Sequence, residues 1–257
     1  MKKKTDSDAA ICSQALFAAL STALEPAEGG QIGTLGEHTL HCVLKHYFEP
    51  DTSKHEIKIG RSYADILRDG RVFEIQTRAL YRLKKKLDTF LSEYEVTVVF
   101  PICVQKTVSW VDEKNCTVSK KRKSPKRGNI ADALPELYGV CEYFGDNAAD
   151  DRFSVMLVLY DGDEYRALDG WGRGGKRGSN RLDIVPTGIR QEIFLGCCDD
   201  CRELFVPMLP DTFTLGDMGR IFGLRGVSAW RALKFLTVTG CAREKEKQGK
   251  KIIYEKT

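Results

Sequence analysis

Residues 63–77 read YADILRDGRVFEIQT, and the interpretation of the fold starts from this stretch. Asp69-Gly70 stands between two runs of β-forming residues. This dipeptide predicts a two-residue hairpin, because a type I′ turn needs a positive φ at both of its central positions. Side chains alternate in direction along each strand, so Asp65 and Glu74 share the side of the hairpin opposite to its apolar residues.

Two acids at facing positions need an explanation. Counted outward from the turn, Asp65 and Glu74 form a non-hydrogen-bonded pair, whose Cβ atoms lie about 4.5–5.5 Å apart. Like charges this close are unfavourable unless one carboxyl is protonated or a divalent cation such as Mg²⁺ or Mn²⁺ lies between them. The alternative is a partly exposed hairpin whose acids pair with nearby Lys or Arg side chains. The spacing alone leaves both interpretations open.

A third acid, Glu37, falls at helical spacing with the apolar stripe formed by Leu40, Leu44 and Tyr47. This spacing predicts that Glu37 points inward. Thr34 and Glu37 also form the Thr-x-x-Glu pattern of a capping box, which is the alternative role of this residue.

The rest of the chain alternates between helical and extended patterns. Apolar residues recur at helical spacing in some segments, and continuous or alternating apolar runs predict strands in others. The predicted helices cover residues 34–48, 79–94 and 129–144, the predicted strands residues 56–77, 96–102, 153–160 and 182–195, and a further predicted hairpin residues 103–118. This order implies a mixed α/β domain over residues 31–209.

Composition places the chain among ordinary globular proteins, since 42% of its 257 residues are hydrophobic and 30% are charged. Nine cysteines at irregular spacing favour reduced thiols in a cytoplasm over a disulfide framework. No run approaches the roughly 18 apolar residues of a membrane span. Residues 1–30 are interpreted as an N-terminal extension, an amphipathic helix followed by a linker. We therefore expect a cytoplasmic protein that does not cross a membrane.

The order of the acids resembles a known superfamily. Glu37 on a first helix, Asp65 on a strand, and Glu74-Ile75-Gln76 on the next strand, followed by a helix, are similar to the PD-(D/E)XK nuclease superfamily. The chain also resembles an uncharacterised group of bacterial proteins with this core, in which IGTLGEHTLH, EIQTR and KSPKRG are the recognisable blocks. The resemblance covers residues 32–136 and implies a restriction-endonuclease-like mixed sheet flanked by helices.

The resemblance implies roles for individual residues. Asp65 and Glu74 are expected to bind Mg²⁺ or Mn²⁺, with the carbonyl of Ile75 as a third ligand. Glu37 is expected to help hold the metal or its waters. Gln76 stands where most members of the superfamily have lysine, so it can orient a water molecule but cannot supply a positive charge. The implied reaction is metal-assisted hydrolysis of a phosphodiester bond.

Several basic residues indicate contact with nucleic acid. Arg78 and Lys84 follow the motif on the next helix, where the resemblance implies contact with the scissile phosphate and where a solvated helix face is the alternative. KKRKSPKR at residues 120–127 has six basic side chains and no acid. Such a run is typical of a loop that contacts phosphates, or of a solvated surface loop. Its candidate contacts are Lys123, Lys126 and Arg127.

Residues 210–257 are similar to a small winged helix-turn-helix. Thr214 and Asp217 predict the start of a first helix, residues 227–239 predict a second, and Gln248-Gly249 predicts the turn of the wing. From residue 211 to the end there are ten Lys or Arg and five Asp or Glu, which suits contact with a DNA backbone. The candidate contacts are Arg225, Arg231, Lys234 and Lys250. A winged helix that binds protein is the alternative.

Three functions are compatible with these patterns. The first is a Mg²⁺-dependent nuclease that acts on DNA, with RNA as the alternative substrate. The second is a DNA-binding protein whose nuclease-like core no longer cuts, because Gln76 replaces the lysine. The third is a protein-interaction module.

Overall fold

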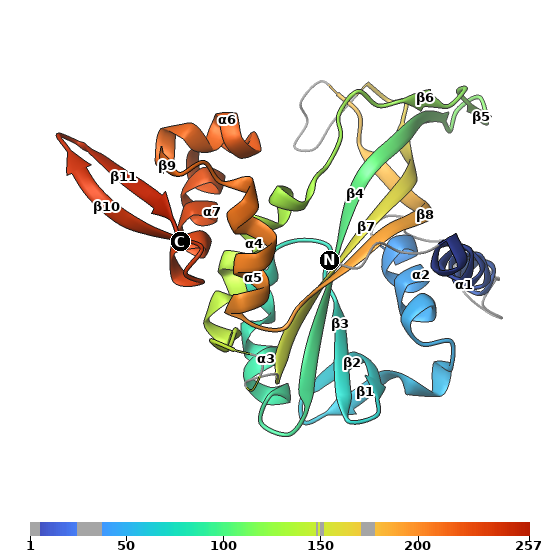
Figure 1. Cartoon of the computed structure of the whole chain (residues 1–257). Coiled ribbons are helices and arrows are strands. Elements are labelled where there is room, and N and C mark those ends of the chain that lie inside the picture. Colours follow the sequence, from blue (N-terminus) through green and yellow to red (C-terminus); the bar gives the residue numbers. More distant parts are fainter. Residues whose placement is uncertain (1–5, 25–37, 148, 150–151, 171–177) are drawn as a thin grey trace. The chain divides into compact units, whose positions relative to one another are not determined.

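The computed structural model describes residues 6–24, 38–147, 149, 152–170 and 178–257. Helices flank a large mixed sheet, so the predicted mixed α/β class is confirmed (Figure 1). The α-helices are α1 (Asp6–Leu24), α2 (His38–Phe48), α3 (Lys84–Phe90), α4 (Leu134–Leu137), α5 (Cys198–Phe205), α6 (Met218–Phe222) and α7 (Gly226–Val238). The 3₁₀ turns are η1 (Thr52–Lys54), η2 (Leu80–Leu83), η3 (Ile130–Ala133), η4 (Tyr138–Tyr143), η5 (Val206–Met208) and η6 (Leu215–Asp217).

The described strands form two sheets. They are β1 (His55–Ile59), β2 (Ser62–Arg68), β3 (Arg71–Ile75), β4 (Glu95–Asp112), β5 (Thr117–Val118), β6 (Arg122–Lys123), β7 (Phe153–Ala167), β8 (Arg181–Leu195), β9 (Thr212–Thr214), β10 (Ala242–Gln248) and β11 (Lys251–Lys256). The larger sheet has the order β1-β2-β3-β4-β7-β8, with β5 and β6 paired to β4, and the smaller has the order β10-β11-β9.

The chain divides into two compact units. The first comprises residues 1–55, 103–129 and 158–192, and the second comprises residues 56–102, 130–157 and 193–257. The long strands β4, β7 and β8 pass from one unit into the other.

In the first unit, α1 packs against α2. Leu16 and Ala19 on α1 and Val43 on α2 form a buried cluster, which Ile189 on β8 borders. Residues 6–24 of the predicted N-terminal extension form the helix α1. The predicted linker at residues 25–30 lies outside the described residues.

In the second unit, the β2–β3 hairpin lies beside β4. β2 and β3 are antiparallel, whereas β3 and β4 are parallel and pair Arg71 with Glu95 and Ile75 with Val99. Parallel neighbours need a crossover connection, and η2 and α3 supply it. The connection is packed into the core, because Leu87 on α3 is fully buried.

The predicted helix at residues 79–94 is shorter than its apolar spacing indicated. Ala79 has a φ of 57°, in the left-handed region, so the helical segment begins only after it. The first turn is the 3₁₀ turn η2, and α3 ends at Phe90. The amphipathic stripe is nevertheless buried as expected, at Leu83, Leu87 and Phe90.

The predicted helix at residues 129–144 is divided into η3, α4 and η4. Pro135 stands in the first turn of α4, where its missing N–H costs no hydrogen bond. Gly139 in η4 approaches the backbone of Tyr81 so closely that a Cβ atom there would lie 2.8 Å from the Tyr81 nitrogen. Close packing of the Gly139 and Tyr81 backbones thus constrains this segment, and the spacing of apolar residues does not reveal such a contact.

Two further differences concern element length. β4 extends from the predicted strand at residues 96–102 through the first half of the predicted hairpin, whose pairing of Val111 with Val118 is present. The helix α5 was not predicted. No helix within the described residues has the length and apolar character that a membrane crossing requires.

The C-terminal segment contains the predicted helices and hairpin. The Thr214 amide donates to Asp217 Oδ2 at 2.9 Å, as in a capping box, immediately before α6. Gly240 follows α7, and Gly249 has a φ of 60° in the turn between β10 and β11.

Helical spacing predicts an apolar stripe on α7 through Val227, Trp230, Leu233 and Leu236, and the buried face of the helix differs from it. Leu233 and Leu236 are buried as expected, but Val227 and Trp230 are 67% and 42% exposed. The helix turns Phe235 inward instead, against the rings of Phe144 and Phe205. Ala229 and Ala232 complete the buried face. Alanine is only weakly hydrophobic, so these two residues did not indicate the buried face in the sequence.

Substitution of Gly70 tests the turn that sets the hairpin register. Gly70 has a φ of 78°, and no atom lies within 4 Å of an added Cβ, so Gly70→Ala introduces only backbone strain. We expect a loss of about 1–2 kcal/mol in the free energy of unfolding, measured by urea denaturation. The matched control is Gly188→Ala, also in open space but without a positive φ, which should be neutral or slightly stabilising. Equal effects of the two substitutions would contradict the turn assignment.

Candidate active site

The hairpin that carries the two acids has the predicted turn and register. Asp69 and Gly70 have φ values of 51° and 78°, as a type I′ turn requires. The register pairs Arg68 with Arg71, Leu67 with Val72, and Ile66 with Phe73. Continuing this register by one step places Asp65 opposite Glu74.

The two acids bind each other's strand. The Ile75 amide donates to Oδ2 of Asp65 at 2.7 Å, and the Asp65 amide donates to Oε1 of Glu74 at 3.2 Å. Each carboxylate therefore accepts a backbone hydrogen bond from the opposite strand. Both side chains are buried, with residue exposures of 8% for Asp65 and 2% for Glu74. The acids thus lie on a buried face of the hairpin and not on a solvated one.

A lysine on α3 balances part of this negative charge. Lys86 Nζ lies 2.8 Å from Oε2 of Glu74, and the ammonium is also 5.9 Å from the centre of the Phe90 ring. Pairing of the acids with a basic side chain was the alternative that the sequence left open. In the structure Glu74 has such a partner, and the site is an Asp-Glu-Lys cluster.

The environment of Glu74 opposes its ionisation. Burial, reinforced by the nearby charge of Asp65, raises the pKa of Glu74 to about 7, although Lys86 and the Asp65 amide act in the opposite direction. Glu74 is therefore poised to exchange a proton near neutral pH. A carboxyl group in this state is a candidate both for proton transfer and for a cation ligand.

Three further residues of the predicted site, Gln76, Arg78 and Lys84, are described by the structure. The Gln76 amide group donates to the carbonyl oxygen of Arg78 at 2.6 Å, so it is engaged with its own loop. Arg78 is exposed. Lys84 pairs with Glu142 at 2.8 Å, away from the acid pair. Glu37 lies outside the described residues.

A divalent cation fits the two carboxylates in part. Mg²⁺ is commonly held by one or two carboxylates while it keeps several waters, and Asp65 with Glu74 supply that number. Within residues 6–24, 38–147, 149, 152–170 and 178–257, no group of three or more His, Cys, Asp or Glu side chains is arranged to hold a metal. Further ligands would have to be backbone carbonyls, waters or substrate oxygens. The Ile75 carbonyl remains the predicted candidate.

The structure brings some of the predicted nucleic-acid contacts together. Lys84 and Arg231 line a cleft of about 470 Å³ with Tyr81 and Tyr138. Lys234 and Lys250 line a second cleft of about 540 Å³ between α7 and the β10–β11 hairpin, which Trp230 also borders.

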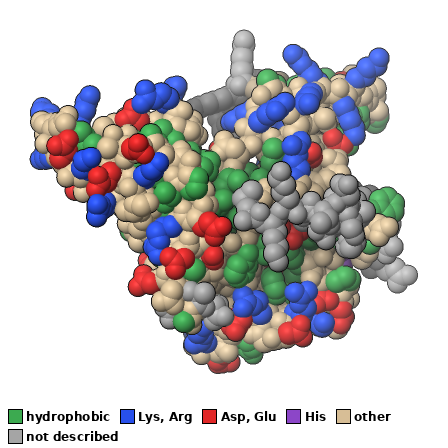
Figure 2. All heavy atoms as spheres, in the orientation of Figure 1, with side chains coloured by type: hydrophobic (Ala, Val, Ile, Leu, Met, Phe, Trp, Pro, Cys, Tyr) green, Lys and Arg blue, Asp and Glu red, His purple; other side chains and the backbone are tan. Residues whose placement is uncertain are grey.

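The remaining candidates are exposed. Arg225 stands just before α7, and Lys123, Lys126 and Arg127 follow one another on and after β6. Lys and Arg side chains gather on the surface where Figure 1 labels β5 and β6 (Figure 2).

Lys86 is the functional candidate that sequence reasoning missed. Lys86 is three residues after Leu83 and four before Phe90, both buried, so its spacing does place it at the border of the buried face. That spacing was the available signal, and it distinguishes Lys86 from the exposed Lys85.

Comparison with known proteins gives a family and a relative. Residues 38–196 match the model of a family described as a domain of unknown function (DUF8091). Over 226 residues the chain is 26% identical to an uncharacterised protein of Treponema pallidum (strain Nichols), covering 88% of this chain and 87% of that protein. No solved structure matches the chain significantly. The Asp-Glu-Lys cluster lies inside the matched residues.

The raised pKa of Glu74 predicts a pH-dependent effect of Glu74→Gln. Because the pKa rises from 4.5 to about 7 on folding, protonation of Glu74 stabilises the fold fully below about pH 4.5, and this contribution is lost as the pH rises through 7. Glutamine has no such loss. We therefore expect the stability of the variant relative to the original chain to increase by about 2–3 kcal/mol between pH 5 and pH 8.

The measurement is urea unfolding at a series of pH values. Glu93→Gln is the control, since Glu93 is an exposed acid just after α3. A pH-independent difference for Glu74→Gln would contradict the assignment of a perturbed carboxyl group.

Proposed function

Since the chain belongs to the DUF8091 family, whose description states no function, we propose a function from the geometry of its acid cluster: hydrolysis of phosphodiester bonds in DNA by a divalent-metal-dependent nuclease. The observation that carries the proposal is the buried Asp65–Glu74 pair on adjacent strands with Lys86 Nζ 2.8 Å from Glu74. Two facing carboxylates and one ammonium suit the handling of a metal ion, a water molecule and a phosphate at one place.

Asp65 and Glu74 would supply two carboxylate ligands to a Mg²⁺ or Mn²⁺ ion. When bound, such an ion polarises a phosphoryl oxygen and lowers the pKa of a bound water. The repulsion that raises the pKa of Glu74 is the interaction that a second positive charge would relieve. Burial of both carboxylates also keeps them at one geometry, because each is fixed by an amide of the opposite strand.

Lys86 supplies the positive charge that Gln76 does not. Its ammonium reaches the acid pair from α3 instead of from β3. In this arrangement the ammonium holds Glu74 in place and can orient a water or a phosphate oxygen beside it. Gln76, whose amide binds the carbonyl of Arg78, is assigned to shaping the loop after β3.

The topology around the cluster supports a restriction-endonuclease-like core. An antiparallel hairpin carries the acids, the crossover through α3 follows, and β4 returns parallel to β3. We assign the C-terminal segment as a winged helix-turn-helix, supported by the order β9, α6, α7, β10, β11 and by the pairing of β9 with β11.

In that assignment α7 is the helix that approaches DNA. Arg225 at its start, Arg231 and Lys234 along it, and Lys250 in the turn of the hairpin are the proposed phosphate contacts. All four side chains are basic, as contact with a DNA backbone requires.

A second function is favoured by a specific observation. Lys86 and Gln76 each bind a group of the protein itself, Glu74 and the carbonyl of Arg78 respectively. A core in which these contacts persist would bind DNA without cutting it. The two functions differ in one measurable respect, the metal-dependent nicking of DNA.

Plasmid nicking in the presence of Mg²⁺ tests the nuclease. We expect Asp65→Asn to lower the rate by roughly 10²–10³-fold, because the carboxylate that fixes the metal and the hairpin is lost. Lys86→Gln is expected to lower it by about 10²-fold, whereas the matched control Lys85→Gln, at the exposed neighbouring position, retains the original rate.

Each outcome identifies one of the functions. Nicking that requires Mg²⁺ and disappears in Asp65→Asn supports the nuclease. DNA binding without nicking, unchanged by Asp65→Asn, supports the non-cutting protein and overturns the nuclease. Equal rates for Lys86→Gln and Lys85→Gln overturn the role of Lys86 alone.

A further inference from the structure

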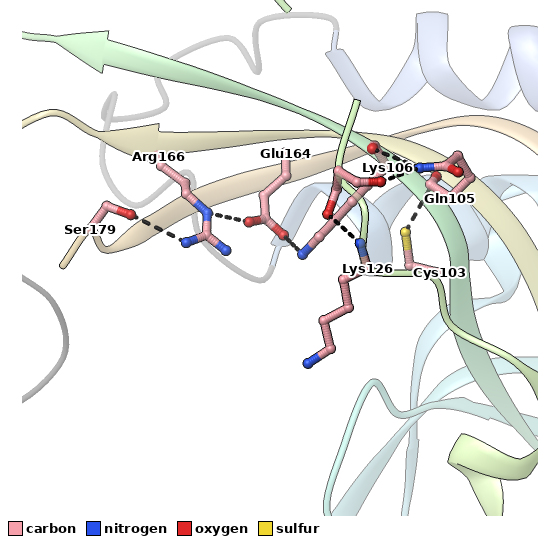
Figure 3. Close-up of polar contacts among 8 residues, drawn as sticks. Cys103, Gln105, Lys106, Lys126, Glu164, Arg166 and Ser179 are labelled. Carbon is pink, nitrogen blue, oxygen red and sulfur yellow. Dashed lines mark hydrogen bonds and ion pairs between the residues drawn. The ribbon is translucent and has the colours of Figure 1, made fainter. Parts of the chain in front are cut away.

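A second buried acid, Glu164 on β7, organises two cations in the first unit. Glu164 is 2% exposed. Its Oε2 binds Lys106 Nζ from β4, and its Oε1 accepts a hydrogen bond from Nε of Arg166, two residues along the same strand. Figure 3 shows the carboxylate between the two basic side chains. The sequence pattern had singled out none of these three residues.

Two basic side chains favour the ionised form of this acid. Burial by itself would raise the pKa of Glu164, but hydrogen bonds and charge from Lys106 and Arg166 outweigh burial and hold the pKa below its usual value. The carboxylate is therefore ionised at neutral pH. With two cations and one anion, the cluster presents a net positive charge.

Both cations remain accessible. The side chains of Lys106 and Arg166 are 23% and 34% exposed. Arg166 also donates from Nη1 to Ser179 Oγ at 3.2 Å, so two of its five N–H donors are used by Glu164 and Ser179. The guanidinium is thus held in one orientation by protein contacts while further donors can serve a ligand.

The basic segment at residues 120–127 is attached to the same strand. β6 pairs with β4, aligning Lys123 with Thr107. The Ser124 amide donates to the carbonyl of Lys106 at 2.9 Å, and Gln105 Nε2 donates to the carbonyl of Ser124 at 3.0 Å. The segment is therefore an ordered edge of the sheet, and its position beside Lys106 is fixed by backbone hydrogen bonds.

The exposed side chains of this edge extend the positive charge. Lys123, Lys126 and Arg127 are exposed, and in Figure 3 the Lys126 side chain points away from its backbone contacts. Lys121 is tied to Asp163, the residue before Glu164. Consecutive acids on β7 thus hold basic residues on the two faces of the strand, because neighbouring side chains point in opposite directions.

We propose that Lys106, Arg166 and the β6 edge form a binding site for the phosphate backbone of nucleic acid, and that Glu164 is its positioning residue. Naming nucleic acid as the polyanion rests on the proposed function. Fixed cations on an extended edge suit a linear chain of phosphates, and cations that are already ordered lose little entropy on binding. Residues 119–128 contain no large apolar side chain to insert into a lipid layer, which favours nucleic acid over a membrane surface.

The test measures binding separately from cutting. The full chain carrying Asp65→Asn is titrated with a labelled DNA duplex at several salt concentrations. The same titration is then made with the chain that carries both Asp65→Asn and Glu164→Gln. Removal of an acid normally strengthens binding to a polyanion. Here we expect the affinity for DNA to fall by about tenfold, because Glu164 no longer holds Lys106 and Arg166 in position. The slope of log affinity against log salt concentration should fall by the equivalent of roughly one to two phosphate contacts.

Glu113→Gln is the matched control. Glu113 is an exposed acid of the same unit, in the turn between β4 and β5, and its loss should leave binding unchanged or tighter. Lys123→Gln with Lys126→Gln, at two surface positions that leave the buried cluster intact, should also weaken binding. This second variant keeps the proposal testable if Glu164→Gln lowers the thermal midpoint of the fold.

Three results would overturn the proposal. One is a Glu164→Gln variant that keeps its thermal midpoint and binds DNA as tightly as the Glu113→Gln control. Another is undiminished binding by the Lys123→Gln, Lys126→Gln variant. The third is attachment to phosphatidylserine vesicles with no binding to DNA. Failure of the nuclease is a different observation, the absence of Mg²⁺-dependent nicking by the chain with Asp65 intact, and it leaves the binding result standing.

Discussion

The reciprocal bonding of Asp65 and Glu74 is the constraint on which the candidate site depends. Each carboxylate accepts an amide of the opposite strand, so neither acid can turn toward water without breaking a hydrogen bond of the hairpin. The tight turn at Asp69-Gly70 fixes the register that makes these bonds possible. From this follow the burial of both acids, the raised pKa of Glu74 and the need for a positive partner, which Lys86 meets from α3.

Glu74 and Glu164 show how neighbouring charge decides the state of a buried acid. Both are 2% exposed, so the cost of desolvation acts on each. Glu74 has one cation and a second acid nearby, and its pKa is raised. Glu164 has two cations, and its pKa is lowered. The same residue type thus has a raised pKa beside a second acid in one unit and a lowered pKa between two cations in the other.

The sequence predicted local features better than those made by packing. Turn chemistry was sufficient for the hairpin, because Asp-Gly at a type I′ turn determines which residues face each other. The capping pair Thr214 and Asp217 was visible for the same reason. The interruption at Gly139 and the inward turn of Phe235 on α7 depend on contacts with distant segments, which periodicity does not contain. Glu164 was missed because a buried charge is recognisable only once its partners, brought from other elements, are known.

The acid cluster sets a competition among three positive charges. Glu74 can hold a proton, the ammonium of Lys86 or a divalent cation, and the first two act in the structure before any metal arrives. A divalent cation held by both acids, as in the proposed nuclease, would compete with the proton and with Lys86 for Glu74, so its affinity would rise with pH until Glu74 is ionised. The lysine then has a double consequence. It stabilises the ionised form of Glu74, and it would oppose the binding of a second cation to the same carboxylate.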